Sequence, residues 1–365
     1  MARRMQNDPN ATLLEALVDA GENVWRKIQL FAIGVLHLLF SSDKQWQRQL
    51  PSRDAGSKAL PSSSGGMRPV AEDTNADAEK ATQYTVKRII FIRHAESEWN
   101  VVFNRGVYWQ AVVQFFRACV REWLMLPTQN SIFIDSPLSR RGVRQSKALF
   151  EHVNDSTHDL ECGIIDAVAK GSATDAALLQ YLSRPMPNSV IVSSNLRRSI
   201  DTARIASAAR LELPGEKIHV LSSLQEIGRN IDTLTISDAY AIKPHALSSV
   251  LPLEKKHDDL FNLSESHGNK AVLGCGRQRL YAFAEWATKQ QADVLVVYGH
   301  SLWFRSFCQE FFPSNIAHDA KTKKLANCGV VTFELEEQVT PVAHNGYAAT
   351  TTRHRIVPES FHYVR

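Results

Sequence analysis

The stretch that decides the fold runs from Lys87 to Asn100 and reads KRIIFIRHAESEWN. Its apolar part, Ile89 to Ile92, is a short run of β-branched and aromatic residues, which is typical of a strand buried on both faces. The run stops at Arg93 and His94, so two polar side chains are expected at the carboxyl end of a central strand. Ligands bind at that edge of open α/β sheets. The stretch therefore predicts an α/β fold with a site that begins at this strand end.

The adjacent Arg93 and His94 suit phosphate chemistry. Arginine supplies paired donors to phosphate oxygens, and a neutral imidazole can attack phosphorus. For this pair alone, a catalytic role and a hydrogen-bonded structural role are equally supported. The remaining strand ends must decide between them.

The composition is that of a globular protein and excludes several other classes. The 365 residues are 44% apolar and 22% charged, enough for one large domain or two smaller ones. A net charge of +4 is too small to indicate nucleic-acid binding. The five cysteines are scattered without a Cys-x-x-Cys pair, so neither a disulfide framework nor a zinc site is predicted. A reduced compartment, the cytoplasm, is expected.

Residues 1–40 are expected to form an amphipathic helical segment. The stretch 28–40 is nearly all apolar, yet it is shorter than the roughly 20 residues that span a bilayer. Two interpretations stay open: the helix packs on the catalytic domain or on a second copy, or it lies on a membrane surface. The apolar residues recur at spacings of three and four, as Leu17, Gly21, Val24, Ile28, Phe31, Val35 and Leu38.

Residues 41–83 are predicted to be a flexible linker, because they contain three prolines, a Ser/Gly run and few large apolar residues. A linker of this length would let the helix act away from the catalytic domain. This favours attachment of residues 13–40 to a membrane surface or to a protein partner. The catalytic domain is then expected over 84–365, with insertions at 101–134 and 239–276.

Three further predicted strands also end in polar residues. The strand 189–193 leads to Arg198, and the strand 217–221 leads to Glu226 and Arg229. The strand 293–298 is the most apolar of the chain. It ends in Gly299, His300 and Ser301, with the glycine allowing close backbone approach.

Three arginines cluster at the start of a helix predicted from Gly142 to His152, with Ser139 as its N-cap. Positive charges at a helix amino terminus oppose the helix dipole, so an anionic ligand nearby would explain their placement. Solvation at the surface is the alternative explanation. The three are Arg140, Arg141 and Arg144.

Together the strand ends supply two histidines, several arginines and one carboxyl group. This set provides a nucleophile, phosphate-binding cations and an acid, as phosphoryl transfer through a phosphohistidine requires. Metal binding is the competing use of two histidines and a glutamate. The neighbouring arginines argue against it, because they would repel a metal ion.

In this order, the motifs resemble those of the histidine phosphatase superfamily, also called the phosphoglycerate-mutase-like family, over roughly Lys87 to Leu335. The resemblance implies a mostly parallel central sheet flanked by helices and a mechanism without metal or cofactor. The matching motifs are Arg93-His94-Ala95-Glu96 with Asn100, Pro137-Leu138-Ser139 with Gly142 and Gln145, Ser194-x-Leu196-x-Arg198 with Thr202-Ala203, Leu224-x-Glu226, and Gly299-His300.

The resemblance also implies roles for individual residues. His94 would be the nucleophile, and Glu226 would protonate the leaving oxygen and then activate water. Three further residues would bind the phosphoryl oxygens, namely Arg93, Arg198 and His300. The expected contacts to the rest of the phosphorylated substrate are Asn100, Arg140, Arg141, Arg229 and Ser301.

Two signatures of true mutases are missing from the chain. The Asn-x-Phe-x-Gly-Trp stretch after the first motif is replaced by Val101 to Gln110, and the Glu-Arg-x-Tyr-Gly stretch by residues 226–229. We therefore expect a phosphomonoester hydrolase that acts on a small phosphorylated metabolite or a phosphoprotein. A mutase-type phosphotransferase and a non-catalytic binding protein of the same fold are the alternatives.

Overall fold

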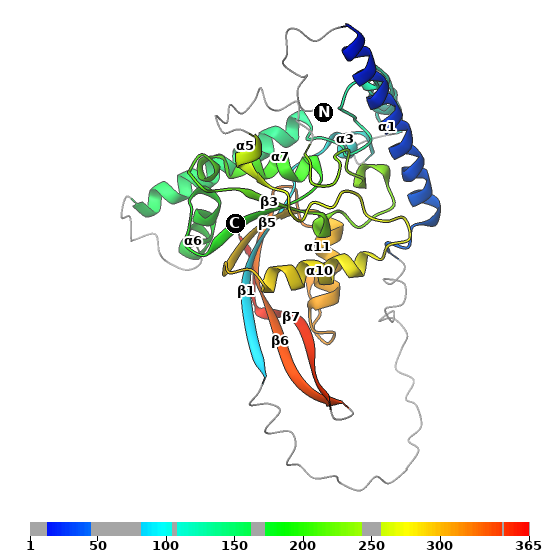
Figure 1. Cartoon of the computed structure of the whole chain (residues 1–365). Helices are drawn as coiled ribbons and strands as arrows, with labels where there is room; N and C mark the ends of the chain where they lie inside the picture. The colour runs from blue at the N-terminus through cyan, green and yellow to red at the C-terminus, as the bar shows by residue number, and fades with distance from the viewer. Residues whose placement is uncertain are drawn as a thin grey trace.

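A seven-stranded sheet, in the order β4-β3-β2-β5-β1-β6-β7, forms the centre of the computed structural model (Figure 1). The structure describes residues 13–44, 82–103, 108–161, 172–242, 257–344 and 347–364. The strands β1 to β5 pair in parallel, whereas β6 and β7 are antiparallel. The strands are β1 (Gln83–Arg93), β2 (Ser189–Ser194), β3 (Ile218–Leu221), β4 (Phe261–Asn262), β5 (Val294–Gly299), β6 (Val330–His344) and β7 (Tyr347–Val364).

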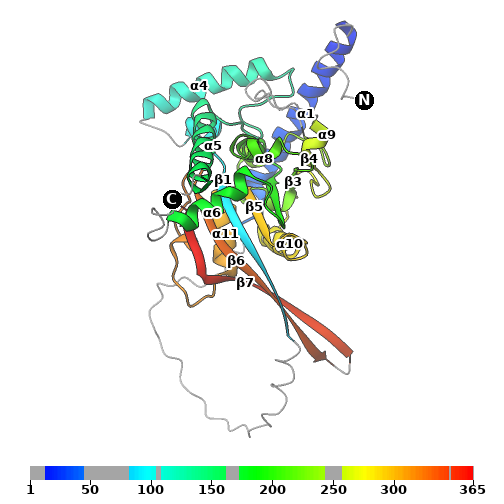
Figure 2. The ribbon, with the colours of Figure 1, turned by 90° about the vertical axis from the view of Figure 1, so that its left-hand side faces the viewer.

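Helices cover both faces of this sheet (Figures 1 and 2). The predicted α/β fold with a mostly parallel sheet is therefore confirmed. The helices are α1 (Leu13–Phe40), α3 (Glu98–Phe103), α4 (Tyr108–Met125), α5 (Arg140–Glu161), α6 (Ser172–Ser183), α7 (Arg197–Ala206), α8 (Ala208–Leu211), α9 (His257–Leu260), α10 (Gly276–Thr288) and α11 (Ser301–Phe311). Short 3-10 helices include η4 (Ser222–Leu224), η5 (Ile231–Thr233) and η7 (Asp319–Lys321).

The central strand β1 is apolar on both sides because it faces two cores. Ile89 and Phe91 pack in the core beneath α10 and α11. Ile90 and Ile92 point to the opposite face and pack with residues of α5, α6 and α7. Alternate residues of a strand point to opposite faces, so an unbroken apolar run is what a strand between two helix layers needs.

The carboxyl-terminal tail that follows Leu335, where the resemblance to the family ends, extends the sheet. The strand β6 continues to His344, and β7 pairs along it. Polar residues alternate here with buried ones such as Ile356. Phe361 stacks on Phe333 with ring centroids 5.9 Å apart. The tail is thus a half-buried strand whose outward residues are polar.

The two expected insertions differ in what they contribute. The segment 101–134 contains the end of α3 and all of α4. In the segment 239–276, residues 243–256 lie outside the described residues, but the remainder is an integral part of the domain. There, β4 pairs with β3 and forms the edge of the sheet, and Lys270 is buried.

The helix α1 docks on the α/β domain through a face that combines polar and apolar contacts. The Arg26 Nε donates to the carbonyl oxygen of Ile236 at 2.9 Å, and the Lys27 ammonium donates to the carbonyl oxygens of Met125 and Asn130. A Cβ on Gly34 would lie 2.8 Å from the Ile231 side chain. These contacts show that α1 packs on its own domain.

The apolar stripe predicted for α1 faces outward. Ile28, Phe31 and Leu38 are each more than half exposed. The docking face is offset from this stripe, because its buried residues are Lys27, Leu30, Gly34 and His37. No described helix is both long and apolar enough to cross a bilayer.

The predicted linker contributes to the domain at its beginning. Ser41 and Asp43 are buried, and the Ser42 hydroxyl donates to the carbonyl oxygen of Gly274 at 3.0 Å. Residues 45–81 of the predicted linker lie outside the described residues. The packed amino-terminal segment therefore extends at least through Asp43, beyond the boundary expected at residue 40.

Candidate active site

Two histidines meet at the carboxyl ends of the neighbouring parallel strands β1 and β5. The rings of His94 and His300 have centroids 5.0 Å apart, and both residues are buried. The main-chain N–H of His94 donates to the carbonyl oxygen of Gly299 at 2.9 Å. A Cβ at Gly299 would lie 2.8 Å from the Phe91 ring, so the close approach of these strand ends needs a glycine.

His94 is held as a neutral imidazole. Burial lowers its pKa well below the ordinary value, and the charges of Arg198 and Arg93 lower it further. Its Nδ1 lies 2.6 Å from the carbonyl oxygen of Ala95. Since a carbonyl can only accept, Nδ1 carries the proton and Nε2 keeps its lone pair. The Nε2 atom therefore carries the free lone pair of this residue.

His300 is neutral for similar reasons. Burial lowers its pKa well below the ordinary value, and the charges of Arg198 and Arg93 lower it further. Its Nε2 lies 2.8 Å from the Ser194 hydroxyl at the end of β2. Its Nδ1 is buried without a hydrogen-bond partner among the described residues. An unpaired buried polar atom is costly, and a polar ligand would satisfy it.

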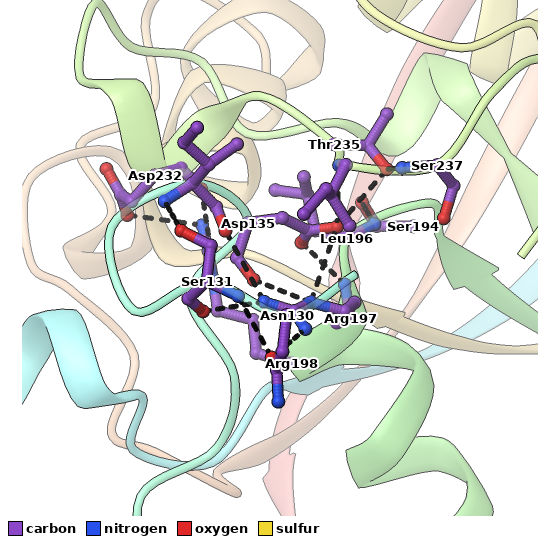
Figure 3. A network of polar contacts seen from close by, with 12 residues as sticks. Asn130, Ser131, Asp135, Ser194, Leu196, Arg197, Arg198, Asp232, Thr235 and Ser237 are labelled. Atoms are coloured by element: carbon purple, nitrogen blue, oxygen red, sulfur yellow. Dashed lines mark hydrogen bonds and ion pairs between the residues drawn. The ribbon is translucent and has the colours of Figure 1, made fainter. Parts of the chain in front are cut away.

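Arg198 projects from the first turn of α7 and is oriented by Asp232. Its Nη1 donates to the Asp232 carbonyl oxygen at 2.8 Å, and its Nη2 lies 3.6 Å from the Asp232 carboxylate. Burial raises the pKa of Asp232 to about 6, although the Arg198 charge opposes the shift. Figure 3 shows both residues in the surrounding polar network.

Arg93 approaches the same site from the end of β1. Its Nη1 donates to the Leu325 carbonyl oxygen at 2.5 Å, while its buried Nε has no partner among the described residues. Burial lowers the pKa of Arg93, and the charge of Glu226 opposes this effect. The Arg93 guanidinium is thus held by a main-chain carbonyl oxygen and lies close enough to the Glu226 carboxylate to interact with its charge.

Glu226 lies against the amino terminus of α11, beside His300. Its Oε1 accepts from the N–H groups of Trp303 at 2.7 Å and Ile227 at 3.0 Å, and its Oε2 accepts from Leu302 at 3.4 Å. Helix amino termini stabilise carboxylates because their N–H groups and dipole favour negative charge. The acid predicted from sequence therefore stands at the same sheet edge as the two histidines.

The comparison with protein families assigns the domain. Residues 168–345 match the profile of the histidine phosphatase superfamily (branch 1). These matched residues therefore belong to a histidine phosphatase superfamily domain. The matched range includes Arg198, Glu226 and His300, whereas Arg93 and His94 precede it.

Solved structures of this fold class share little sequence with the chain. A mycobacterial glucosyl-3-phosphoglycerate phosphatase in complex with VO3 is 16% identical, covers 74% of this chain and 97% of its own, and has a TM-score of 0.33. The ecdysone phosphate phosphatase from Bombix mori is 10% identical, with 73% and 92% covered and a TM-score of 0.35. Phosphoglycerate mutase from Plasmodium falciparum is 13% identical, with 73% and 99% covered and a TM-score of 0.28. No curated protein matches the chain.

Sequence reasoning missed the buried network that supports the candidate site. Arg197 donates from its main-chain N–H to the Asp135 carboxylate at 2.8 Å and from Nε to the Asp135 carbonyl oxygen at 2.9 Å (Figure 3). Its Nη atoms donate to Asn130 and Ser131. Asp135 also accepts from the Ile236 N–H at 3.1 Å. These residues fix the start of α7, and Arg197 serves the fold.

The expected substrate-binding residues are placed unevenly. Ser301 is buried directly after His300, and Arg229 is half-buried on the Glu226 loop. The Asn100 Oδ1 accepts from the Ser97 hydroxyl at 2.8 Å. Arg140 and Arg141 are exposed, so the fold does not include them in the buried set.

The start of α5 nevertheless packs against the loop that follows His94. The N-cap predicted for Ser139 is present, since its hydroxyl accepts from the Gly142 N–H at 3.0 Å. A Cβ at Gly142 would lie 2.0 Å from the Glu96 carbonyl oxygen. The Arg141 Nη1 lies 3.9 Å from the Glu96 carboxylate, which partly explains a positive charge at this helix end.

Within the described residues, no group of three or more His, Cys, Asp or Glu side chains could hold a metal ion.

Proposed function

We propose that this protein hydrolyses phosphomonoesters through a phosphohistidine formed at His94. The observation that carries the proposal is the neutral, buried His94, whose Nδ1 is occupied by the Ala95 carbonyl so that Nε2 remains available. Nε2 attacks the phosphorus atom, and the bond from phosphorus to the leaving oxygen breaks. Glu226, in its protonated form, gives its proton to that oxygen. The resulting carboxylate then takes a proton from water, the water oxygen bonds to phosphorus, and the bond from phosphorus to Nε2 breaks, which releases inorganic phosphate and restores the imidazole.

The surrounding charges support this route. Arg93, which is half-buried, and Arg198, which is buried, place two guanidinium groups beside the histidines, where they stabilise negative charge that grows on the phosphoryl oxygens. The unpaired Nδ1 of His300 offers a further polar contact at the same edge. In a buried site such interactions are stronger than in water.

Hydrolysis is favoured over phosphoryl shuffling because both mutase signatures are missing. The acid motif continues as Glu226-Ile227-Gly228-Arg229 rather than the mutase pattern. A non-catalytic role is disfavoured because the nucleophile, the acid and the arginines are all retained. Small phosphorylated metabolites and phosphoproteins are both candidate substrates.

The test is phosphate release from p-nitrophenyl phosphate in the presence of a chelator. Wild type and His267→Ala, which alters an exposed histidine, should be active, whereas His94→Ala should fall to background. Alkaline-quenched wild type should carry a phosphoryl group on His94 by mass spectrometry. Activity that survives in His94→Ala, or is lost to the chelator, would contradict the proposal. Isomerisation of 3-phosphoglycerate without phosphate release would identify a mutase.

We further propose that α1 and α4 attach the protein peripherally to a membrane surface. The helix α1 has 28 residues, so its outer face extends over about 42 Å. Leu17, Trp25, Ile28 and Val35 lie on it and are exposed. Each apolar side chain left in water forgoes roughly 1.5–3 kcal/mol of burial free energy, so this face favours an apolar environment.

The helix α4 adds a second apolar face at the same end of the molecule (Figures 1 and 2). Ala118 is buried against the domain, whereas Trp109, Phe116 and Trp123 are exposed. Lys27 of α1 donates to the carbonyl oxygen of Met125 at the end of α4, so the two helices meet. Tryptophan and phenylalanine on an exposed helix face beside arginines are typical of helices that lie in a lipid interface.

Flotation with liposomes that contain anionic lipid tests this attachment. The double variant Ile28→Glu/Phe116→Glu should lose flotation, while Gln29→Glu/Gln110→Glu, which adds the same charges at exposed polar positions, should retain it. Wild type that stays with the soluble fraction would contradict the proposal. A wild-type dimer that the first double variant converts to a monomer would identify the surface as an interface between two copies.

A further inference from the structure

The segment that follows α1 passes behind the loop of Glu226. There the Asp43 carboxylate is buried and accepts three different donors. Its Oδ2 accepts from the Gly228 N–H at 2.9 Å and from the Lys270 ammonium at 2.9 Å, and its Oδ1 accepts from Arg279 at 2.8 Å. Asp43 is separated from Gly228 by 185 positions, so the contact is formed only by the fold.

Lys270 connects this carboxylate to the main chain of the acid loop. Besides Asp43, its ammonium donates to the carbonyl oxygen of Glu226 at 2.8 Å and to that of Gly228 at 2.7 Å. All three donors of the ammonium are thus occupied. The main chain on both sides of Ile227 is consequently held at three groups. These are the carbonyl oxygens of Glu226 and Gly228, which bind Lys270, and the N–H of Gly228, which binds Asp43.

The packing around Asp43 leaves little room for another arrangement. A Cβ at Gly276 would lie 2.6 Å from the Asp43 carbonyl oxygen. The Arg279 Nη2 also reaches the carbonyl oxygen of Gln225 at 3.4 Å, directly before the acid. The Glu226 loop therefore lies between α11, which binds its carboxylate, and this cluster of charges, which binds its backbone.

Buried ion pairs are poor stabilisers, because desolvation offsets much of their attraction. Here the charges do more than neutralise each other. Asp43 binds the Gly228 N–H directly and orients the Lys270 ammonium, which binds two carbonyl oxygens of the same loop. We propose that Asp43 is a positioning residue for Glu226, and that the amino-terminal segment is part of the active site. This inference rests on the proposed hydrolysis through phospho-His94.

The electrostatics agree with this geometry. Burial lowers the pKa of Lys270 to about 8, while the Asp43 carboxylate opposes the shift. For Asp43, burial would raise the pKa, but Lys270 and Arg279 outweigh it, so the pKa is lowered. Removal of the Asp43 charge would therefore lower the pKa of Lys270 further and favour loss of its proton.

The test compares two esters that differ in their need for a general acid. p-Nitrophenyl phosphate has a good leaving group, whereas an alkyl phosphate requires protonation of its leaving oxygen. Asp43→Asn should lose at least tenfold more kcat/KM on the alkyl ester than on the nitrophenyl ester. Glu226→Gln should show the same pattern, and the double variant should lose no more than Glu226→Gln alone, because the two residues act through one group.

A second measurement tests the activation of water in the hydrolysis of phospho-His94. With p-nitrophenyl phosphate, Asp43→Asn should give a burst of nitrophenol and accumulate phospho-His94, because the second step also needs Glu226. If Asp43→Asn does not fold, Arg279→Gln should show the same selective loss, whereas Arg277→Gln, on the exposed side of α10, should not. An equal loss on both esters without a burst would overturn the positioning role alone. Wild type that hydrolyses neither ester would overturn this proposal together with the proposed function.

Discussion

Arg197 and Arg198 are neighbours at the start of α7, yet their side chains have different surroundings. Arg197 is surrounded by acceptors, with Nε and both Nη atoms on oxygens of the 130–135 loop. Arg198 is held at one edge by Asp232, and its charge lowers the pKa of both histidines. Consecutive helical residues point in different directions, so one arginine faces the supporting loop and the other faces the sheet edge.

The comparison shows how a buried arginine that supports the fold differs from one available to a ligand. A guanidinium whose donors are all bound to protein oxygens has no capacity left for substrate. One that is oriented from a single side keeps a fork that can bind phosphate oxygens in pairs. Residue type and spacing cannot separate the two, but variants of each can.

The largest effect is expected from Arg197→Ala. Loss of this guanidinium leaves the buried Asp135 without its cationic partner, so the unfolding free energy should fall by about 3–5 kcal/mol. Urea denaturation measures it. Arg140→Ala, at an exposed position, should change stability by no more than about 0.5 kcal/mol. If Arg197→Ala is as stable as wild type, then Arg197 does not stabilise the fold as we infer.

Arg198→Lys should affect catalysis instead of folding. Lysine keeps the charge but loses the planar fork, so kcat/KM should fall by about 10²–10³, as for removal of one transition-state donor. The urea midpoint should stay near that of wild type. Arg140→Lys and Arg141→Lys serve as controls. If either control falls as far as Arg198→Lys, the exposed arginines also contact the substrate.

The smallest and most specific effect concerns the pH dependence set by Asp232. Its pKa is raised to about 6 by burial, so it gains a proton and loses its charge as the pH falls through that value. Activity should then decline severalfold, because Arg198 loses its counter-charge. Asp232→Asn should abolish this acidic limb of the pH profile.

Stability should respond to pH in the opposite sense. Because the folded pKa of Asp232 lies above the ordinary value of 3.8, the native state binds this proton more tightly than the unfolded chain does. The stabilisation is complete below pH 3.8 and is lost as the pH rises through 6. Between pH 5 and 7, wild type should therefore lose stability relative to Asp232→Asn in urea titrations. An opposite trend would show that the carboxylate is stabilised rather than penalised.

The contrast between the two arginines also explains how far sequence reasoning reached. The apolar run before Arg93 predicted a strand, and the carboxyl ends of parallel strands share one edge. The meeting of His94 and His300 followed from these two facts. Ser139 was predicted as an N-cap because a hydroxyl three residues before a helical N–H is a local pattern. The strand and the cap depend on neighbours in the chain, and the meeting of the histidines depends on a general rule for parallel sheets, so the sequence alone determined these features.

The supporting residues were decided by tertiary structure alone. Asp232 meets Arg198 across 34 positions, Asp135 meets Arg197 across 62, and Asp43 meets Gly228 across 185. No periodicity or cap marks these pairs, because their energy comes from burial of complementary groups that only the folded loops bring together. The docking face of α1 has the same origin. Local periodicity identified an apolar stripe, but carbonyl oxygens and apolar side chains of distant segments determined which face became buried.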